Sequence, residues 1–164
     1  MKNCFVVLTL LASALFLSGR SEARDLAEDL PKIIQTASSV LFDRSASTEQ
    51  ILGALVHLLD AALLALPQSA QATDARKNLE AARTEMKDSS PLSDKAYRYL
   101  DQAYRALNAG KSFQFPEVHS IEEAKAHIKD LLAASVAGLK KGPEAPTSRL
   151  LLESVIMVVT PMPR

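Results

Sequence analysis

The chain has 164 residues, with 19 basic and 19 acidic side chains and a formal net charge of zero. General nucleic-acid binders and binders of anionic membranes need a concentrated positive field, and no basic run here is longer than the pair Lys140-Lys141. The only cysteine is Cys4, so the chain after it offers no disulfide, no thiolate nucleophile and no cysteine metal ligand.

Residues 1–23 have the pattern of a secretory signal peptide. Lys2 gives a positive start, an apolar run follows from Cys4 to Leu17, and Ser21 and Ala23 are the small residues of a cleavage site. The run is shorter than the about 20 residues that a membrane-spanning helix needs. We therefore expect cleavage after Ala23 and a mature chain of residues 24–164, one domain without a transmembrane segment. Small secreted eukaryotic domains usually depend on disulfides, so their absence favours a bacterial periplasmic or extracellular protein.

The first half of this domain predicts three helices. The first spans about residues 25–43 and has an apolar face at threes and fours; Pro31 should either kink it or mark its true first turn. The second starts at Ser47, with Gln50 completing a capping box, and stops before Pro67. It is apolar nearly all round, which is typical of a central helix. The third covers about residues 70–87 and should lie outside, because it is largely polar apart from a face that contains Ala75, Leu79, Ala82 and Met86.

The second half predicts three more helical segments. Ser90 as N-cap and Pro91 as first residue should open a fourth helix, which Asn108 and Gly110 close. After a linker over residues 111–119, Ser120 and Glu123 should cap a fifth helix that ends near residue 142. A sixth segment spans residues 147–160. Its run of β-branched residues at 155–159 suits a strand, but no partner strand is present, so we expect a buried helix. The prediction is an all-α bundle of five or six helices, with the second and sixth most buried.

Residues 47–83 align without a gap with residues 120–156, which suggests an internal repeat. Ten of these 37 positions are identical, and both copies begin with a capping box and break at the same offset. Two Ala- and Leu-rich helices also share residues by accident, so chance similarity is the alternative. A true repeat would give two similar helical hairpins, neither able to bury its apolar face alone.

The residues most suggestive of chemistry are His119, Glu123, His127 and Asp130. The last three share one face of the predicted fifth helix, and His119 could fold back from the position before the cap. Imidazole and carboxylate ligands suit a divalent cation such as zinc, copper or nickel. The alternative is that Glu123 is only the capping partner and pairs with His127 at the surface.

His57 and Asp60 form a second polar pair, three residues apart on the most apolar helix. A buried ionisable pair is costly unless it is satisfied, so it could line a pocket or orient a ligand. A hydrogen-bonded core pair, or an exposed stripe on a mostly buried helix, is the favoured alternative.

Aromatic residues occupy the fourth helix and the linker. Tyr97 and Tyr104 are seven residues apart around Leu100, a spacing that favours core packing over the stacking of bases or sugars. Phe113 and Phe115 should plug one end of the bundle, with an exposed partner-binding knob as the alternative.

The sequence contains none of the common catalytic motifs: no GxSxG, P-loop, GxGxxG, CxxCH or HExxH. We therefore expect an exported, non-enzymatic binding or protein-interaction module without a cofactor, whose partner is a protein or a small ligand. The alternative is a divalent-metal-binding bundle that uses the histidine and carboxylate cluster. The apolar sixth helix also suggests homodimerisation.

Overall fold

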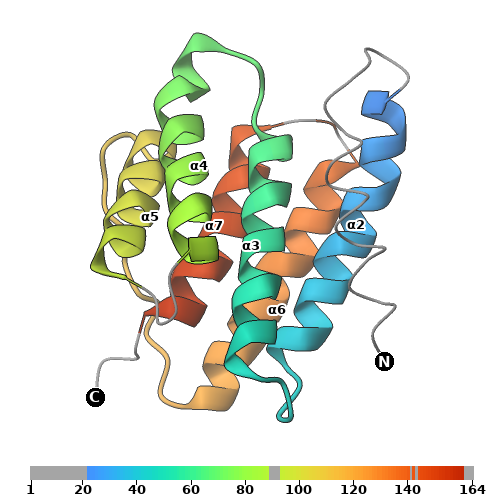
Figure 1. Cartoon of the computed structure of the whole chain (residues 1–164), viewed down its shortest axis with the longest axis vertical. Helices are drawn as coiled ribbons and strands as arrows, with labels where there is room; N and C mark the ends of the chain where they lie inside the picture. The colour runs from blue at the N-terminus through green and yellow to red at the C-terminus, as the bar shows by residue number, and fades with distance from the viewer. Residues whose placement is uncertain (1–21, 89–92, 141, 143, 161–164) are drawn as a thin grey trace.

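The computed structural model describes residues 22–88, 93–140, 142 and 144–160, and this part of the chain is all-helical. Within these residues, six α-helices and one short 3-10 turn make a compact bundle (Figure 1). The helices are α2 (Glu22–Leu41), α3 (Thr48–Ala65), α4 (Thr73–Asp88), α5 (Asp94–Leu107), α6 (Ile121–Leu139) and α7 (Ala145–Val159), with the 3-10 turn η1 (Ala70–Ala72) leading into α4. The predicted signal segment, apart from its last two residues, lies outside the described residues; those two residues form the start of α2.

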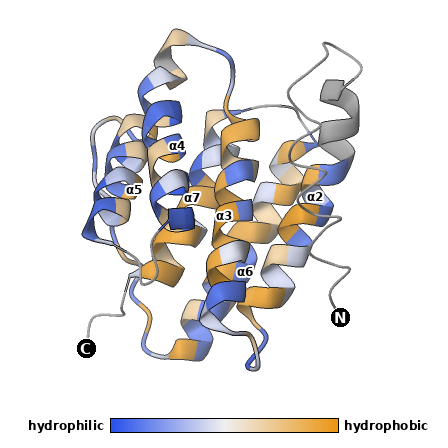
Figure 2. Ribbon diagram, in the orientation of Figure 1, coloured by the Kyte–Doolittle hydropathy of each residue, from blue (hydrophilic) through white to orange (hydrophobic). Residues whose placement is uncertain are grey.

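The helices pack as two layers of three. The first layer is α4, α3 and α2, with α3 in the middle, and the second is α5, α7 and α6, with α7 in the middle. Across the layers α4 packs on α5, α3 on α7 and α2 on α6. The two central helices are therefore the predicted second and sixth. In Figure 2, many of the hydrophilic positions lie on α4 and α5, at one edge of the bundle.

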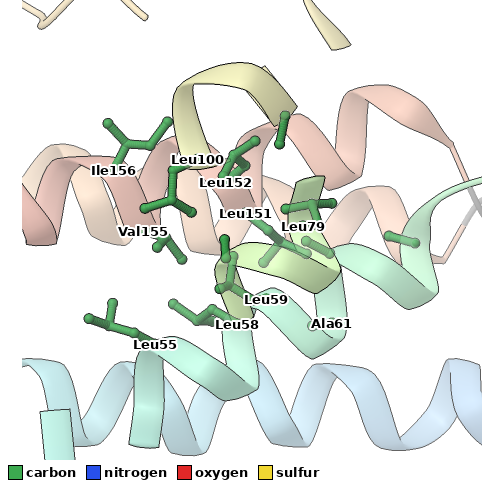
Figure 3. Packing of buried hydrophobic residues seen from close by; sticks show 14 of the residues in the cluster. Leu55, Leu58, Leu59, Ala61, Leu79, Leu100, Leu151, Leu152, Val155 and Ile156 are labelled. Atoms are coloured by element: carbon green, nitrogen blue, oxygen red, sulfur yellow. The ribbon is translucent and has the colours of Figure 1, made fainter. Parts of the chain in front are cut away.

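The core lies where α3 and α7 meet. Leu58, Leu59, Leu151 and Val155 are fully buried there, and Leu79 of α4 and Leu100 of α5 close it from the side (Figure 3). Full burial of one such side chain stabilises the fold by about 1.5–3 kcal/mol. By length and composition α3 could cross a membrane, but in this fold it is the central helix of the core.

Capping residues explain most helix starts. Ser47 accepts a hydrogen bond from the amide of Gln50, whose side chain accepts one from the Ser47 amide, so the predicted capping box is confirmed. Ser120 likewise caps α6 by accepting from the amide of Glu123. Each such cap is worth about 1 kcal/mol because it satisfies otherwise unpaired amides.

One prediction about a helix start was wrong, and one of the two alternatives for Pro31 is excluded. The fourth helix, α5, begins at Asp94 and is capped by Ser93, which accepts from the amide of Ala96, whereas the predicted Ser90 and Pro91 lie outside the described residues. Pro31 lies inside α2 and does not mark its first turn. Sequence patterns misled because Ser-Pro and Asp-Leu-Pro fit a helix start as well as the true caps do.

The two segments of the predicted repeat fold as adjacent helical hairpins, α3–α4 and α6–α7. Helix α6 begins 73 residues after α3, and the other boundaries agree at this offset within two residues. The helices that correspond nevertheless occupy different places: α3 is central and α6 is at an edge, whereas α4 is at an edge and α7 is central. The repeat itself stays a prediction.

Candidate functional site

A pocket of about 620 Å³ opens where α5, α6 and α7 meet the linker between α5 and α6. We call it the linker pocket. Its walls come from four segments of the chain, and most of the lining side chains carry a polar group. The lining residues are Tyr104, Asn108, Lys111, Ser112, Phe113, Gln114, Pro116, His127 and Glu153.

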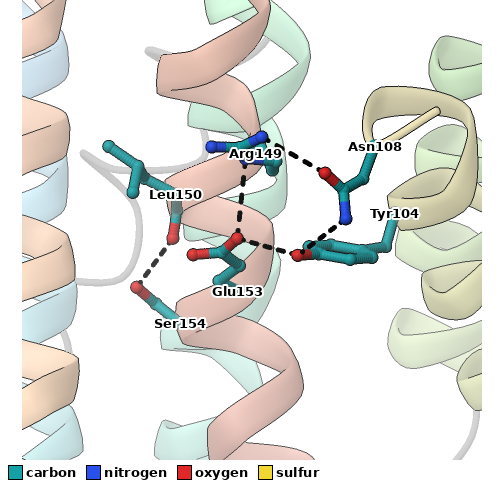
Figure 4. A network of polar contacts seen from close by, with 6 residues as sticks. All are labelled: Tyr104, Asn108, Arg149, Leu150, Glu153 and Ser154. Atoms are coloured by element: carbon teal, nitrogen blue, oxygen red, sulfur yellow. Dashed lines mark hydrogen bonds and ion pairs between the residues drawn. The ribbon is translucent and has the colours of Figure 1, made fainter. Parts of the chain in front are cut away.

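A closed network of polar contacts forms the wall of this pocket between α5 and α7 (Figure 4). Tyr104 Oη donates to Glu153 Oε1 at 3.0 Å, and Asn108 Nδ2 donates to Tyr104 Oη at 3.3 Å. Arg149 Nη1 donates to Asn108 Oδ1 at 3.3 Å, and Arg149 Nε lies 3.6 Å from Glu153 Oε1. The four side chains therefore hold one another in place. The side chain of Glu153 is only 16% exposed, so its charge depends on these partners.

The Tyr104 hydroxyl acts as a hydrogen-bond donor to Glu153. Burial raises the pKa of Tyr104, and the hydrogen bond to Glu153 and the charge of that carboxylate raise it further, while Arg149 opposes them. The phenol therefore stays protonated well beyond neutral pH, and Glu153 stays its acceptor.

The turn at the end of α5 directs the linker along the side of the linker pocket. Asn108 ends the helix, and Ala109 and Gly110 then take positive φ values of 48° and 81°, which turn the chain back along the bundle. Phe113 packs edge-on against Tyr104 with ring centroids 5.4 Å apart, and Phe115 packs edge-on against Phe113 at 5.2 Å. Such aromatic pairs add about 0.5–1.5 kcal/mol each beyond their burial, so the linker is fixed at its middle.

A second pocket, of about 430 Å³, adjoins the first at Phe113. We call it the aromatic pocket. It lies between α5, the C-terminal end of α7 and the linker, and its walls are largely apolar. They consist of Tyr97, Arg98, Leu100, Asp101, Gln102, Phe113, Phe115, Ile156 and Thr160.

The predicted metal ligands are not gathered in one place. Within the described ranges, no three His, Asp or Glu side chains are positioned to hold a metal ion together. Glu123 is occupied as a cap, because its Oε2 accepts from the His119 amide at 2.6 Å. His119, Glu123 and Asp130 are exposed, whereas His127 is half-buried and lines the linker pocket. Glu123 is therefore a capping partner, as the alternative had it, although the amide belongs to His119, one residue before the cap. The surface pair of Glu123 with His127 is not found among the described residues.

His57 and Asp60 do not form a buried pair. Both are half-buried on the outward stripe of α3, and Asp60 forms an ion pair with Arg83 of α4. Burial lowers the pKa of His57; Asp60 opposes this, and Lys87 and Arg83 reinforce it. The two residues are therefore neither a core pair nor an exposed stripe, and the interaction that the sequence did not reveal is the ion pair of Asp60 with Arg83.

The polar residues of the linker pocket were mostly missed by sequence reasoning. Arg149 and Glu153 are the only charged residues of α7 and stand four apart on an otherwise apolar central helix. Two charges on such a helix need partners, and this was the available signal. The partners themselves, Tyr104 and Asn108, lie more than 40 residues away in sequence, and nothing local identifies them.

Comparison with known proteins adds no relatives: no family model, no curated protein sequence and no solved structure matches this chain.

Proposed function

We propose that the protein is an exported, non-enzymatic binding module and that the linker pocket is its ligand site. The observation that carries the proposal is the network around Glu153. It holds an acid, an amide and a phenol at the wall of an open pocket, with Arg149 behind them in contact with the acid and the amide. Ligand sites are typically clefts with a few convergent polar groups of this kind. The pocket volume of about 620 Å³ suits a small molecule.

Groups that are fixed before binding lose little freedom when a ligand arrives. Tyr104, Asn108 and Arg149 are each held by another member of the network, so their donors and acceptors are oriented in advance. Lys111, Ser112 and Gln114 stand on a linker that the aromatic contacts fix to α5. The Tyr104 hydroxyl donates to Glu153, and its pKa is raised by burial and by this carboxylate, so it is suited to hydrogen bonding and not to attack as an activated nucleophile. This supports binding over catalysis.

The test is an amide NMR titration of the mature chain with a fragment library grouped by charge. Binding at the site should shift the amides of residues 108–116 and of His127. Glu153→Gln keeps the shape of the side chain and should change these shifts, whereas Glu80→Gln, at the matching position of α4 and exposed, should not. Shifts confined to other surfaces, or no shifts with any fragment class, would reject the linker pocket as the ligand site.

Export is tested separately. The full chain produced in a bacterium should appear outside the cytoplasm with the mass of residues 24–164, and removal of residues 2–23 should keep it inside. Native mass spectrometry of the exported protein would also reveal a ligand that is carried through purification.

A further inference from the structure

We infer that the ligand is an amphipathic organic acid, with its carboxylate in the linker pocket and its apolar part in the aromatic pocket. The inference rests on the proposed function and assigns the ligand's chemical class. Two observations carry it: the balance of charge around the two pockets, and the row of aromatic rings that joins them.

The acids that line the two pockets are already matched by arginines. Glu153 faces Arg149, and Asp101 accepts from Arg105 Nε at 2.7 Å. The lining cations Lys111 and Arg98 are different, since no carboxylate lies within ion-pair distance of either in the part of the chain that the structure describes. An incoming anion would therefore meet unmatched positive charge, whereas a cation would have to compete with arginines for each acid.

Lys111 and His127 line the linker pocket from two directions, the linker and α6. A carboxylate bound there could accept from the Lys111 ammonium and from the imidazole N–H of His127. Charge-assisted hydrogen bonds of this kind are about twice as strong as neutral ones.

The aromatic rings define where the rest of the ligand would lie. Tyr104, Phe113 and Phe115 form an edge-to-face row, and Phe113 is common to both pockets. Beyond Phe113, Leu100 and Ile156 make an apolar wall. A ligand with a carboxylate at one end and an apolar chain at the other matches the change from polar to apolar lining along this row.

The experiment uses four probes on the mature chain: octanoate, octanol, octylamine and acetate, each below its micelle-forming concentration. Isothermal calorimetry gives the affinities, and amide NMR shifts locate the binding. We expect octanoate to bind most tightly and to shift residues 111–116 together with residues near Ile156. Octanol should be weaker because it lacks the charge, acetate because it lacks the chain, and octylamine because its charge is wrong.

Two substitutions test separately the contacts proposed for the charged end and for the apolar end of the ligand. Lys111→Gln should weaken octanoate by about tenfold, which is the effect of losing one charge-assisted hydrogen bond. Lys140→Gln, an exposed lysine at the end of α6, is the matched control and should have no effect. Phe113→Leu keeps an apolar anchor for the linker and should weaken octanoate more than acetate.

Two results would overturn the inference. Octylamine binding as well as octanoate, or octanoate binding unchanged in Lys111→Gln, would show that the site does not select an acid. If fragments of another class still shift the linker pocket, the proposed function stands and only the ligand class is wrong. If no probe and no fragment shifts it, both proposals fail.

Discussion

The two hairpins have helices of matching length in the same order, yet they meet opposite surroundings. In α3–α4 the first helix is central and the second is at the edge; in α6–α7 the order is reversed. Ala61 of α3 is fully buried, whereas Ala134, at the matching position of α6, is exposed. A shared helix pattern therefore does not determine where a helix lies. What differs is the apolar content, since α4 is largely polar and α7 is largely apolar.

The linker pocket follows from this reversal. Because α7 is central, its two charged residues are drawn into the bundle and need partners, which α5 supplies. In the other hairpin Arg76 matches Arg149, and it donates instead to the carbonyl oxygens of Leu63 and Leu66 at the end of α3. Glu80, which matches Glu153, is exposed. One hairpin thus uses its arginine to cap a helix, and the other uses it to hold Asn108 and Glu153 beside the linker pocket.

The largest expected difference between the hairpins comes from matched leucines. Leu59→Ala, in central α3, should cost about 4–5 kcal/mol, and Leu132→Ala, in α6 at the edge, about 2–3 kcal/mol. The side of α6 that faces solvent can relax around the lost volume more easily. Urea unfolding monitored by circular dichroism measures both. An equal or greater cost at Leu132 would contradict the assignment of α6 to the edge.

Enlarging the matched alanines tests the same contrast in the opposite direction. Ala61→Leu should destabilise the fold by about 1–3 kcal/mol, because the added atoms have no space in the core. Ala134→Leu should change stability by less than about 0.5 kcal/mol, since its side chain would point to solvent. Thermal melts of the two variants give the comparison directly, and similar losses in both would argue against it.

A close contact within the second hairpin has no counterpart in the first. A Cβ added at Gly138 would collide with Thr147 Oγ1 of α7, whereas the matching position in α3 already holds Ala65. Gly138→Ala should therefore cost about 1–3 kcal/mol by overpacking. In a protein that already carries Thr147→Ala, the Gly138→Ala substitution should cost less stability than it does in the wild type. Additive costs in the double-mutant cycle would show that the contact is not responsible.

The outward stripe of α3 should give a smaller effect, visible only in its pH dependence. The folded protein lowers the pKa of His57, so the unfolded chain binds a proton more readily. The contribution of neutral His57 to the free energy of unfolding should be fully present above the ordinary histidine pKa. It should be lost as the pH falls through the lowered pKa of His57 in the folded protein. His57→Gln should flatten this part of the curve, whereas Asp130→Asn, at the matching position of α6, should leave it in place. Unfolding free energies measured from pH 8 to pH 5 test the difference.

Metal binding should give the smallest effect. We expect no stoichiometric, tight uptake of Zn²⁺ or Cu²⁺ by the mature chain, because Glu123 is engaged as a cap and the other three residues do not gather around one point. Calorimetric titration of the wild type and of His127→Ala should give the same result. Tight one-to-one uptake that is lost in His127→Ala would restore the metal-binding alternative.

Sequence patterns predicted the helices well because local rules govern them. The capping box at Ser47, the stop before Pro67, the buried face of α4 and the central place of α3 and α7 all follow from spacing and composition. The candidate site was only partly predictable. His127 was predicted as a metal ligand and lies at the linker pocket, and Tyr104 was placed on the inner face without a partner. The polar network of the site joins Tyr104 to Glu153, 49 positions apart, and Asn108 to Arg149, 41 positions apart. Helix periodicity carries no information at such separations.

The central position of α7 also bears on when the fold can form. Helices α2 to α5 each pack against their neighbour in sequence, so this part can assemble from local contacts as the chain emerges. The last described helix then has to enter between α3, α5 and α6, and it brings with it Leu151, Leu152 and Val155 of the core. Until it does, the apolar face of α3 stays open to solvent or to another protein. A chain interrupted before Ala145 would therefore keep its first layer but expose the apolar face of α3, a state that proteases and chaperones recognise.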